Sequence, residues 1–375
     1  MGVLLWVSLL LAAACGSASP RQAPPPAATG APLLPAESGL PEPPVCEAAP
    51  ILQRAGRVIV AGLSGVSTAD HPLVDLLAKA GVGAVMLRQD SLENAEQVQA
   101  LVAGLRQRLG PELLVAIDEE GGRVSAMESL GVSIPSARKL GRAGPPAAYE
   151  AGLEVGTTAR SVGIDWVLAP VADLDAGPWN GVIGDRSFGA DPSAVAASTT
   201  AFARGLRDGG VVATAKHYPG YAGAADTHRA PAAAEVLLDE LVHRHLVPFD
   251  AVVAEGVSAV MLSHVAYPRI WGVLPASLEA AAYQMLRGSG FQGVAVTDSL
   301  GMGAVNRQWG FADAAVMAVG AGADAVLVTQ GDQALVIRDA VAAAVADGRL
   351  PESRLDEAVG RMADLAEASR TGLVC

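Results

Sequence analysis

Short apolar segments alternate with longer segments of helical periodicity along most of the chain. Eight apolar runs of five or six residues have the length of buried strands. Between several of them, apolar residues recur at spacings of three and four, which is the pattern of an amphipathic helix. The strand-like runs are 58–63, 82–87, 113–117, 164–168, 211–215, 258–262, 293–297 and 324–328, and the clearest helical segments are 95–109, 147–161, 192–208 and 237–255.

This alternation predicts a single-domain α/β fold, a (β/α)8 TIM barrel, over residues 51–375. Eight strand-and-helix units in one array favour a closed barrel over an open doubly wound sheet. Two further helical segments, 335–348 and 353–371, would complete the array, and no second domain or short-period repeat is visible. With 375 residues, of which 51% are hydrophobic, the chain is long enough for one large domain with a sizeable core.

The first 50 residues have a different pattern. Residues 3–14 form an uninterrupted run of apolar or small residues, about as long as the hydrophobic region of a signal peptide and too short to span a bilayer. The run ends in L-A-A-A-C, and a small-residue triplet before a cysteine resembles the lipobox of bacterial lipoproteins. We therefore expect residues 1–15 to direct export, with lipidation at Cys15 and either anchoring at the outer face of the cell membrane or secretion. Residues 16–50, rich in Pro, Ala and Ser, predict an extended tether.

Two cysteines remain if Cys15 is lipidated. Cys46 lies near the end of the tether and Cys375 is the last residue. In an oxidising compartment an even pair is a candidate disulfide, and the first and last elements of a closed barrel are neighbours. We therefore predict a disulfide between Cys46 and Cys375. No pattern of cysteines or histidines suggests a zinc site.

The charge of the chain limits its partners. There are 26 basic and 39 acidic residues, and the formal net charge is −13. This excess of negative charge argues against binding nucleic acid or an anionic membrane face through bulk charge. A neutral or cationic partner is easier to accommodate.

Polar residues follow several of the predicted strands, where a barrel carries its catalytic groups. The fifth run leads into A-K-H-Y-P-G-Y-A-G-A-A-D-T-H-R-A, residues 215–230. Lys216 and His217 are expected where the strand ends and the loop begins. Asp226 and His228 follow on a loop of small residues, and an Asp close to a His can orient the imidazole and raise its proton affinity. Taken alone, this spacing is more often a solvated loop.

The order K-H-x-P-G followed by D-T-H resembles the catalytic loop of family 3 glycoside hydrolases of the β-N-acetylglucosaminidase type. The resemblance implies that His228, paired with Asp226, is the acid/base group. It also implies that Lys216 and His217 donate hydrogen bonds to sugar hydroxyls. The chain departs from the family at residues 221–222, where Tyr-Ala replaces the His-Gly of P-G-H-G, and the spacer before Asp226 is one residue shorter.

Motifs after three other predicted strands extend the resemblance over residues 50–370. The loop after the third run, D-E-E-G-G-R-V, is similar to the family's D-Q-E-G-G-R-V, which implies that Asp118 and Arg123 bind substrate. After the fourth run, A-P-V-x-D is followed by R-S-F-G, and the resemblance implies substrate binding by Arg186. The seventh run ends in T-D-S-L-G-M, similar to the family's nucleophile segment, which implies that Asp298 attacks the anomeric carbon.

Three positions near these motifs bear on the interpretation. Asp173, in the A-P-V-x-D segment, is as compatible with a structural turn as with a substrate contact. His264, after the sixth run, is expected to be a structural histidine and is left out of the catalytic set. At Ala126 the chain lacks an Arg that many glucosaminidases of the family carry.

Together these features predict a retaining β-N-acetylhexosaminidase that releases terminal N-acetyl-β-D-glucosamine from cell-wall muropeptide fragments through a glycosyl-Asp intermediate. The expected partner is a carbohydrate that contains N-acetylglucosamine. We expect no nucleic-acid partner, no contact with the membrane except through the lipid anchor, and no metal or organic cofactor.

Two alternative functions stay open. A phosphorylase is one, because a neutral His would not repel phosphate. A sugar-binding lipoprotein without catalysis is the other, motivated by residues 221–222 and Ala126.

Overall fold

The computed structural model of the protein describes residues 49–176 and 181–371. The expected export signal and nearly all of the tether lie outside these residues, and so do Cys15, Cys46 and Cys375. Lipidation, the disulfide and the segment boundaries at residues 15 and 50 therefore stay predictions. Within the described residues, no helix is both long and apolar enough to cross a bilayer.

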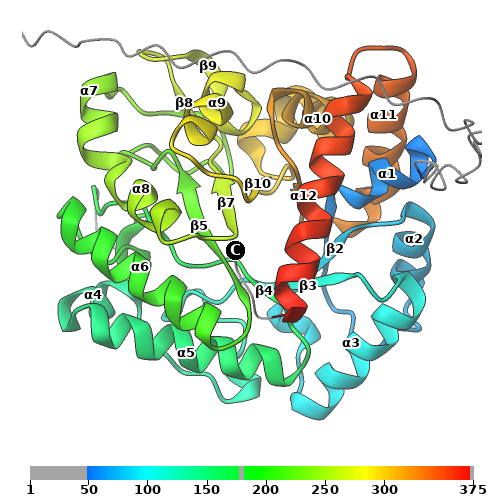
Figure 1. The fold of residues 1–375 in the computed structure, drawn as a ribbon, viewed down its shortest axis with the longest axis horizontal. Coiled ribbons are helices and arrows are strands. Elements are labelled where there is room, and N and C mark those ends of the chain that lie inside the picture. The colour runs from blue at the N-terminus through cyan, green and yellow to red at the C-terminus, as the bar shows by residue number, and fades with distance from the viewer. Residues whose placement is uncertain (1–48, 177–180, 372–375) are drawn as a thin grey trace, which may run out of the picture. The chain divides into compact units, whose positions relative to one another are not determined.

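Eight parallel strands form the barrel and confirm the predicted (β/α)8 fold (Figure 1). The ladder of hydrogen bonds follows the order β10-β7-β5-β4-β3-β2-β1-β11. The ring closes where the Thr297 N–H donates to the Ala325 carbonyl at 3.1 Å, beside a parallel bridge between Val296 and Ala325. The strands are β1 (Ile59–Leu63), β2 (Ala84–Leu87), β3 (Leu114–Ile117), β4 (Trp166–Val167), β5 (Val212–Tyr218), β7 (Ala259–Leu262), β10 (Val294–Thr297) and β11 (Val326–Val328).

Helices surround the barrel, and two of them have the predicted bounds because their first turns are capped. The Asn94 side chain accepts from the Gln97 N–H at 3.0 Å, and the Asp191 side chain accepts from the Ala194 N–H at 2.9 Å. The helices are α1 (Ile51–Arg57), α2 (Pro72–Ala80), α3 (Ala95–Leu109), α4 (Ala137–Ala143), α5 (Pro145–Ser161), α6 (Pro192–Asp208), α7 (Leu238–Glu240), α8 (Val247–Ala254), α9 (Ala280–Gly288), α10 (Gly303–Ala321), α11 (Ala334–Ala346) and α12 (Glu352–Thr371), with 3₁₀ turns at Gln89–Ser91, Glu128–Leu130, Gly184–Arg186, Ala276–Leu278 and Gly331–Gln333.

Two segments differ from the prediction. The helix expected over 237–255 is divided by a π turn at Leu241–His245, because Pro248 in the first turn of α8 has no N–H to donate. Strand β5 extends beyond 211–215 to Tyr218, because the Lys216 N–H donates to the Pro170 carbonyl at 3.1 Å and keeps the chain extended. Lys216 and His217 therefore lie within the strand rather than after it.

A small second sheet was not expected from the sequence. It has the order β6-β8-β9, with β6 (Ala232–Ala233), β8 (Val265–Tyr267) and β9 (Gly272–Pro275). Strands of two to four residues are too short to show a hydrophobic period. Strand β6 directly follows the loop that carries Asp226 and His228, and its next residue, Ala234, donates to the Ala266 carbonyl at 2.9 Å. The small sheet therefore fixes the far end of that loop.

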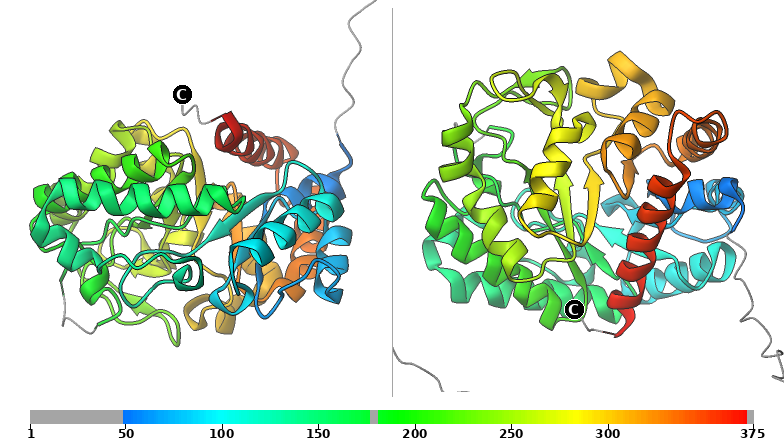
Figure 2. Two further views of the ribbon diagram at one scale, coloured as in Figure 1. Left: turned by 90° about the horizontal axis from the view of Figure 1, so that it is seen from below. Right: turned by 45° about the horizontal axis from the view of Figure 1, so that its top comes forward.

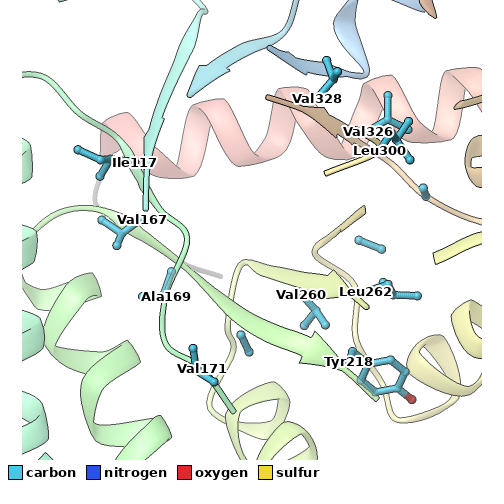
Figure 3. Close-up of a cluster of buried hydrophobic side chains, with 14 of the residues drawn as sticks. Ile117, Val167, Ala169, Val171, Tyr218, Val260, Leu262, Leu300, Val326 and Val328 are labelled. Carbon is cyan, nitrogen blue, oxygen red and sulfur yellow. The ribbon is translucent and has the colours of Figure 1, made fainter. Parts of the chain in front are cut away.

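The core has an outer and an inner part, because successive side chains on a strand point to opposite faces. The outer part packs the strands against the helices, and Figure 3 shows Val167, Val260 and Val326 among its members. The inner part fills the barrel and includes Val60 and Trp166 together with three side chains of α12, namely Met362, Leu365 and Ala366. Helix α12 thus covers the amino-terminal end of the barrel (Figures 1 and 2), and the loops with the candidate motifs follow the carboxyl ends of the strands.

Candidate active site

Lys216 joins two carboxylates at the carboxyl end of the barrel. Its ammonium lies 2.6 Å from an oxygen of Asp118 and 2.6 Å from an oxygen of Glu120, both on the loop after β3. Burial lowers the pKa of Lys216, but the two carboxylates outweigh burial and raise it above its usual value. The group is therefore a permanent ammonium, while the Asp118 carboxylate remains 41% exposed and accessible to a ligand.

Arg186 extends this cluster from the loop after β4. Its guanidinium holds both oxygens of Glu120, at 2.7 and 2.8 Å, in the bidentate geometry that favours Arg over Lys. One nitrogen of the same group lies 3.4 Å from Nε2 of His217. Burial would raise the pKa of Glu120, but the charges of Arg186 and Lys216 prevail and hold the pKa of this carboxyl well below its usual range.

Asp173 positions His217 and the start of the following loop. Its carboxylate is wholly buried, accepts from the backbone N–H of His217 at 3.1 Å and lies 2.7 Å from Nδ1 of the imidazole. Its other oxygen accepts from the Tyr221 N–H at 2.7 Å. Because Nδ1 is bonded to a carboxylate, Nε2 is the ring nitrogen that faces Arg186. The sequence was as compatible with a structural turn as with a substrate contact at Asp173, and these bonds support the structural role.

Asp298 lies directly after β10 and does not cap α10, whose N-cap is Met302. One of its oxygens accepts from the Ser299 N–H at 2.7 Å. Burial opposes ionisation, but the imidazoles of His264 and His217 and the Ser299 N–H outweigh it and lower the pKa of Asp298. The side chain is therefore an ionised carboxylate near neutral pH, as a nucleophile must be.

His264 has the environment of a structural histidine, as expected. It is buried, with Nδ1 2.6 Å from the Ser277 hydroxyl and Nε2 2.9 Å from the Ser299 carbonyl oxygen. Burial is the main cause of its lowered pKa. These bonds hold the backbone beside Asp298 in place.

Asp226 and His228 form the expected pair on the loop after β5. An oxygen of Asp226 lies 2.6 Å from Nδ1 of His228 and accepts from the His228 N–H at 2.9 Å. The two side chains are 49% and 59% exposed, so the pair is accessible to solvent. The loop rests on the start of α10, where the Gly303 N–H donates to the His228 carbonyl at 2.8 Å. The Ala304 N–H likewise donates to the Thr227 carbonyl at 3.1 Å, so the segment that carries the pair is tied to the helix that follows Asp298.

Comparisons with known proteins identify the family. The sequence profile of the glycosyl hydrolase family 3 N terminal domain matches residues 57–365. The chain belongs to this family. Relatives include the beta-hexosaminidase LpqI of Mycobacterium tuberculosis, 38% identical over 263 residues that cover 68% of each chain, and a beta-hexosaminidase of Xylella fastidiosa, 35% identical over 314 residues that cover 81% of this chain and 91% of the relative.

Solved structures of family 3 enzymes have the same fold. A β-N-acetylglucosaminidase of this family from Paenibacillus gives a TM-score of 0.82 at 36% identity, covering 88% of this chain and 64% of the solved chain. This chain thus spans less than two thirds of that enzyme. A family 3 member from Mycobacterium smegmatis gives 0.79 at 35% identity and covers 85% of this chain and 97% of the other. Together with the family match, these relatives show a glycosidase that acts on O-glycosyl bonds.

In this family 3 glycosidase, Arg123 is turned toward the neighbouring loop. Its guanidinium donates to the carbonyls of Gly181, Val182 and Ile183 at 2.7 to 3.2 Å and lies 3.0 Å from Asp185. These contacts hold the loop that carries Arg186. The expected substrate contact of Arg123 stays a prediction, and the geometry favours a positioning role.

Sequence reasoning missed the two glutamates of the D-E-E-G-G-R-V loop as individual site residues. Glu119 is buried and accepts from the backbone N–H groups of Gly121, Ala126 and Met127, so it holds the loop from inside. Glu120 is the shared partner of Lys216 and Arg186. Their place next to Asp118 in the motif was the one available signal.

Replacing Glu120 by glutamine should destabilise the fold by about 3–5 kcal/mol at neutral pH, because it leaves two buried cations without their shared partner. The folded pKa of Glu120 is depressed, so its contribution is complete above the unfolded value of about 4.3 and is lost as pH falls below it. Urea unfolding should therefore show a shallower acid dependence for Glu120→Gln than for the native protein. Glu128→Gln, an exposed carboxylate on the same loop, should change stability by less than about 0.5 kcal/mol. Equal stabilities of Glu120→Gln and the native protein would contradict this role.

Proposed function

We propose that this glycosidase is a retaining β-N-acetylhexosaminidase that releases terminal N-acetyl-β-D-glucosamine. The observation that carries the proposal is the position of Asp298 directly after β10, together with the Asp226–His228 pair on a loop that is hydrogen-bonded to Gly303, five residues beyond Asp298. A carboxylate nucleophile and an acid/base group are the two elements that a retaining mechanism needs. The names of the relatives, beta-hexosaminidase and β-N-acetylglucosaminidase, support this sugar specificity.

The reaction has two steps. First, an oxygen of Asp298 attacks the anomeric carbon while the bond to the leaving oxygen breaks and His228 gives that oxygen its proton. Second, His228 takes a proton from water as the water oxygen attacks the anomeric carbon, and the glycosyl-Asp298 bond breaks to return the carboxylate. Asp226 holds Nδ1 of the imidazole, so Nε2 is the nitrogen that exchanges the proton. Two inversions at one carbon give net retention.

The cluster around Lys216 supplies the groups for sugar hydroxyls. Asp118 is an exposed acceptor and Lys216 and Arg186 are fixed donors, each held by ion pairs before the substrate arrives. Groups held in this way lose little freedom when a ligand binds, which favours affinity. Nε2 of His217, which lies beside Arg186, is a further group for hydrogen bonding to the sugar.

A comparison of two chromogenic substrates tests the proposed specificity. We expect aryl N-acetyl-β-glucosaminide to be cleaved with a kcat/KM at least about 100-fold above that for the aryl β-glucoside, because a site built for the acetamido group rejects an analogue that leaves polar groups unpaired. Product analysis should give free N-acetylglucosamine both with and without phosphate. Equal rates for the two glycosides, or a sugar phosphate as the product, would overturn the proposal.

The cell wall is the proposed location of the substrate. Support comes from the apolar segment 3–14, the small-residue triplet before Cys15 and the following Pro-rich tether, which together favour export and attachment at the outer face of the membrane. In cells, we expect the protein in the membrane fraction and expect Cys15→Ala to release it. Purified muropeptide fragments should yield N-acetylglucosamine on incubation with the enzyme. A native protein that fractionates as soluble, or fragments that stay intact, would contradict the respective part of this proposal.

A further inference from the structure

Tyr221 contacts both His217, at the end of β5, and the loop that carries Asp226 and His228. The side chain is 3% exposed, and its ring packs edge to face on His217, with centroids 5.6 Å apart and an interplanar angle of 79°. Its backbone N–H donates to Asp173, the residue that also holds His217. Tyr221 is therefore part of the rigid arrangement at the end of β5.

The hydroxyl of Tyr221 makes a hydrogen bond with the hydroxyl of Thr227. Thr227 is wholly buried, whereas Asp226 and His228 on either side of it are about half exposed. The alternation means that the Thr227 side chain points into the protein while the side chains of the two catalytic candidates point toward solvent. A hydrogen bond to the Thr227 side chain therefore restricts the backbone between Asp226 and His228, and with it the positions of both side chains.

We propose that the Tyr221 hydroxyl is a latch that holds the Asp226–His228 segment in its working position through Thr227. In this role Tyr221 is a positioning residue that does not touch the reacting atoms. The inference rests on the proposed function, since it assumes that His228 is the acid.

The environment keeps the latch in one protonation state. Burial raises the pKa of the Tyr221 hydroxyl far above its usual value, and the negative charge of Asp298 adds to the effect. The hydroxyl therefore keeps its proton near neutral pH. Two other contacts fix the root of the loop, since the Tyr267 hydroxyl donates to the Gly220 carbonyl and the Ala224 N–H donates to the Tyr221 carbonyl at 2.9 Å. Neither contact reaches residues 226–228. The carbonyls of Thr227 and His228 accept from Ala304 and Gly303 at 3.1 and 2.8 Å, which ties this segment to α10, and the Tyr221 hydroxyl ties it to the end of β5.

Tyr221→Phe tests the latch because it keeps the ring on His217 and removes the hydroxyl alone. Loss of a hydrogen bond of this kind lowers the ratio of correctly placed to displaced loop about fivefold. We expect kcat/KM to fall by up to about fivefold for an aryl glycoside with a poor leaving group, and to fall clearly less for one with a good leaving group, which needs no acid. Thr227→Val should give the same pattern, and the double variant should lose no more than either single variant. Thr227→Ser, which keeps the hydroxyl, should retain activity.

Tyr283→Phe is the matched control, because it removes a buried hydroxyl that donates to the Ser277 carbonyl at 2.8 Å and lies outside this loop. It should leave the ratio of rates for poor and good leaving groups unchanged. Hydrogen exchange gives a second readout, and amides of residues 222–230 should exchange faster in Tyr221→Phe than in Tyr283→Phe.

His228→Ala, measured in parallel, separates the two hypotheses. If His228→Ala discriminates between leaving groups while Tyr221→Phe does not, the latch is overturned and the acid role of His228 stands. If His228→Ala itself loses equally with both substrates, the acid role fails and the latch falls with it. Unchanged hydrogen exchange in Tyr221→Phe would also overturn the latch, whatever the kinetics of His228→Ala.

Discussion

Replacing Asp298 by alanine or asparagine should abolish turnover, with a loss in kcat on the order of 10⁴-fold or more. The reason is that the first step needs a carboxylate at the anomeric carbon, and the amide of asparagine is a poor nucleophile with nearly the same shape. Because Asp298 lies just after β10 and is partly exposed, the fold should survive the change. Steady-state kinetics with an aryl N-acetyl-β-glucosaminide would measure the loss, and circular dichroism and thermal unfolding would report the fold.

Asp332 offers a matched control for Asp298. It is an exposed acidic residue on the loop after β11, the next strand of the ring, and its carboxylate accepts from the side chain of Gln333 at 3.2 Å. Asp332→Asn should retain nearly full activity. An Asp298→Asn variant that stays folded and keeps more than about a tenth of the native kcat would remove this residue from the mechanism.

His228→Ala should lose about 10²- to 10⁴-fold in kcat/KM with a poor leaving group, the range that general acid catalysis contributes. With a good leaving group the loss should be small, because the phenolate departs without a proton. The parameter kcat/KM is the one to compare, since it reports the steps up to formation of the intermediate. A series of aryl glycosides whose phenols differ in pKa would give the dependence directly.

A second Asp–His pair provides the control for this experiment. His243 lies 3.3 Å from Asp239, and both side chains are highly exposed on the segment that begins with α7. His243→Ala should show the native dependence on the leaving group. Equal losses of His228→Ala with good and poor leaving groups would argue that the imidazole does not act as the acid.

The barrel was predictable because its strands are short apolar runs in a chain whose helices are amphipathic. The errors occur where a contact distant in sequence decides the local structure. Strand β5 extends through Lys216 to Tyr218 because the segment after β4 pairs with it, and no local pattern shows that pairing. The break in 237–255 was visible in principle, since Pro248 interrupts the helical pattern.

The site was predictable to the extent that motifs carry it. Asp118, Lys216 and Asp298 could be named from their places after the apolar runs and from the family resemblance. Glu120 could not be singled out, because an acidic residue in a glycine-rich turn is usually solvated, and its burial depends on Lys216 and Arg186 from other strands. The partnership of Tyr221 with Thr227 likewise depends on the path of the loop, which sequence spacing does not give.

The position of α12 has a consequence for the order of events during synthesis. The interior of the barrel gains apolar neighbours, among them Met362 and Leu365, from α12, which follows all eight strands in the sequence. A nascent chain that has already made all eight strands still exposes one end of their packed interior to water. Domains that emerge from the ribosome fold as units, and this unit is complete only after α12 has emerged. A premature stop codon shortly before Glu352 would therefore remove the floor of the barrel along with the last helix.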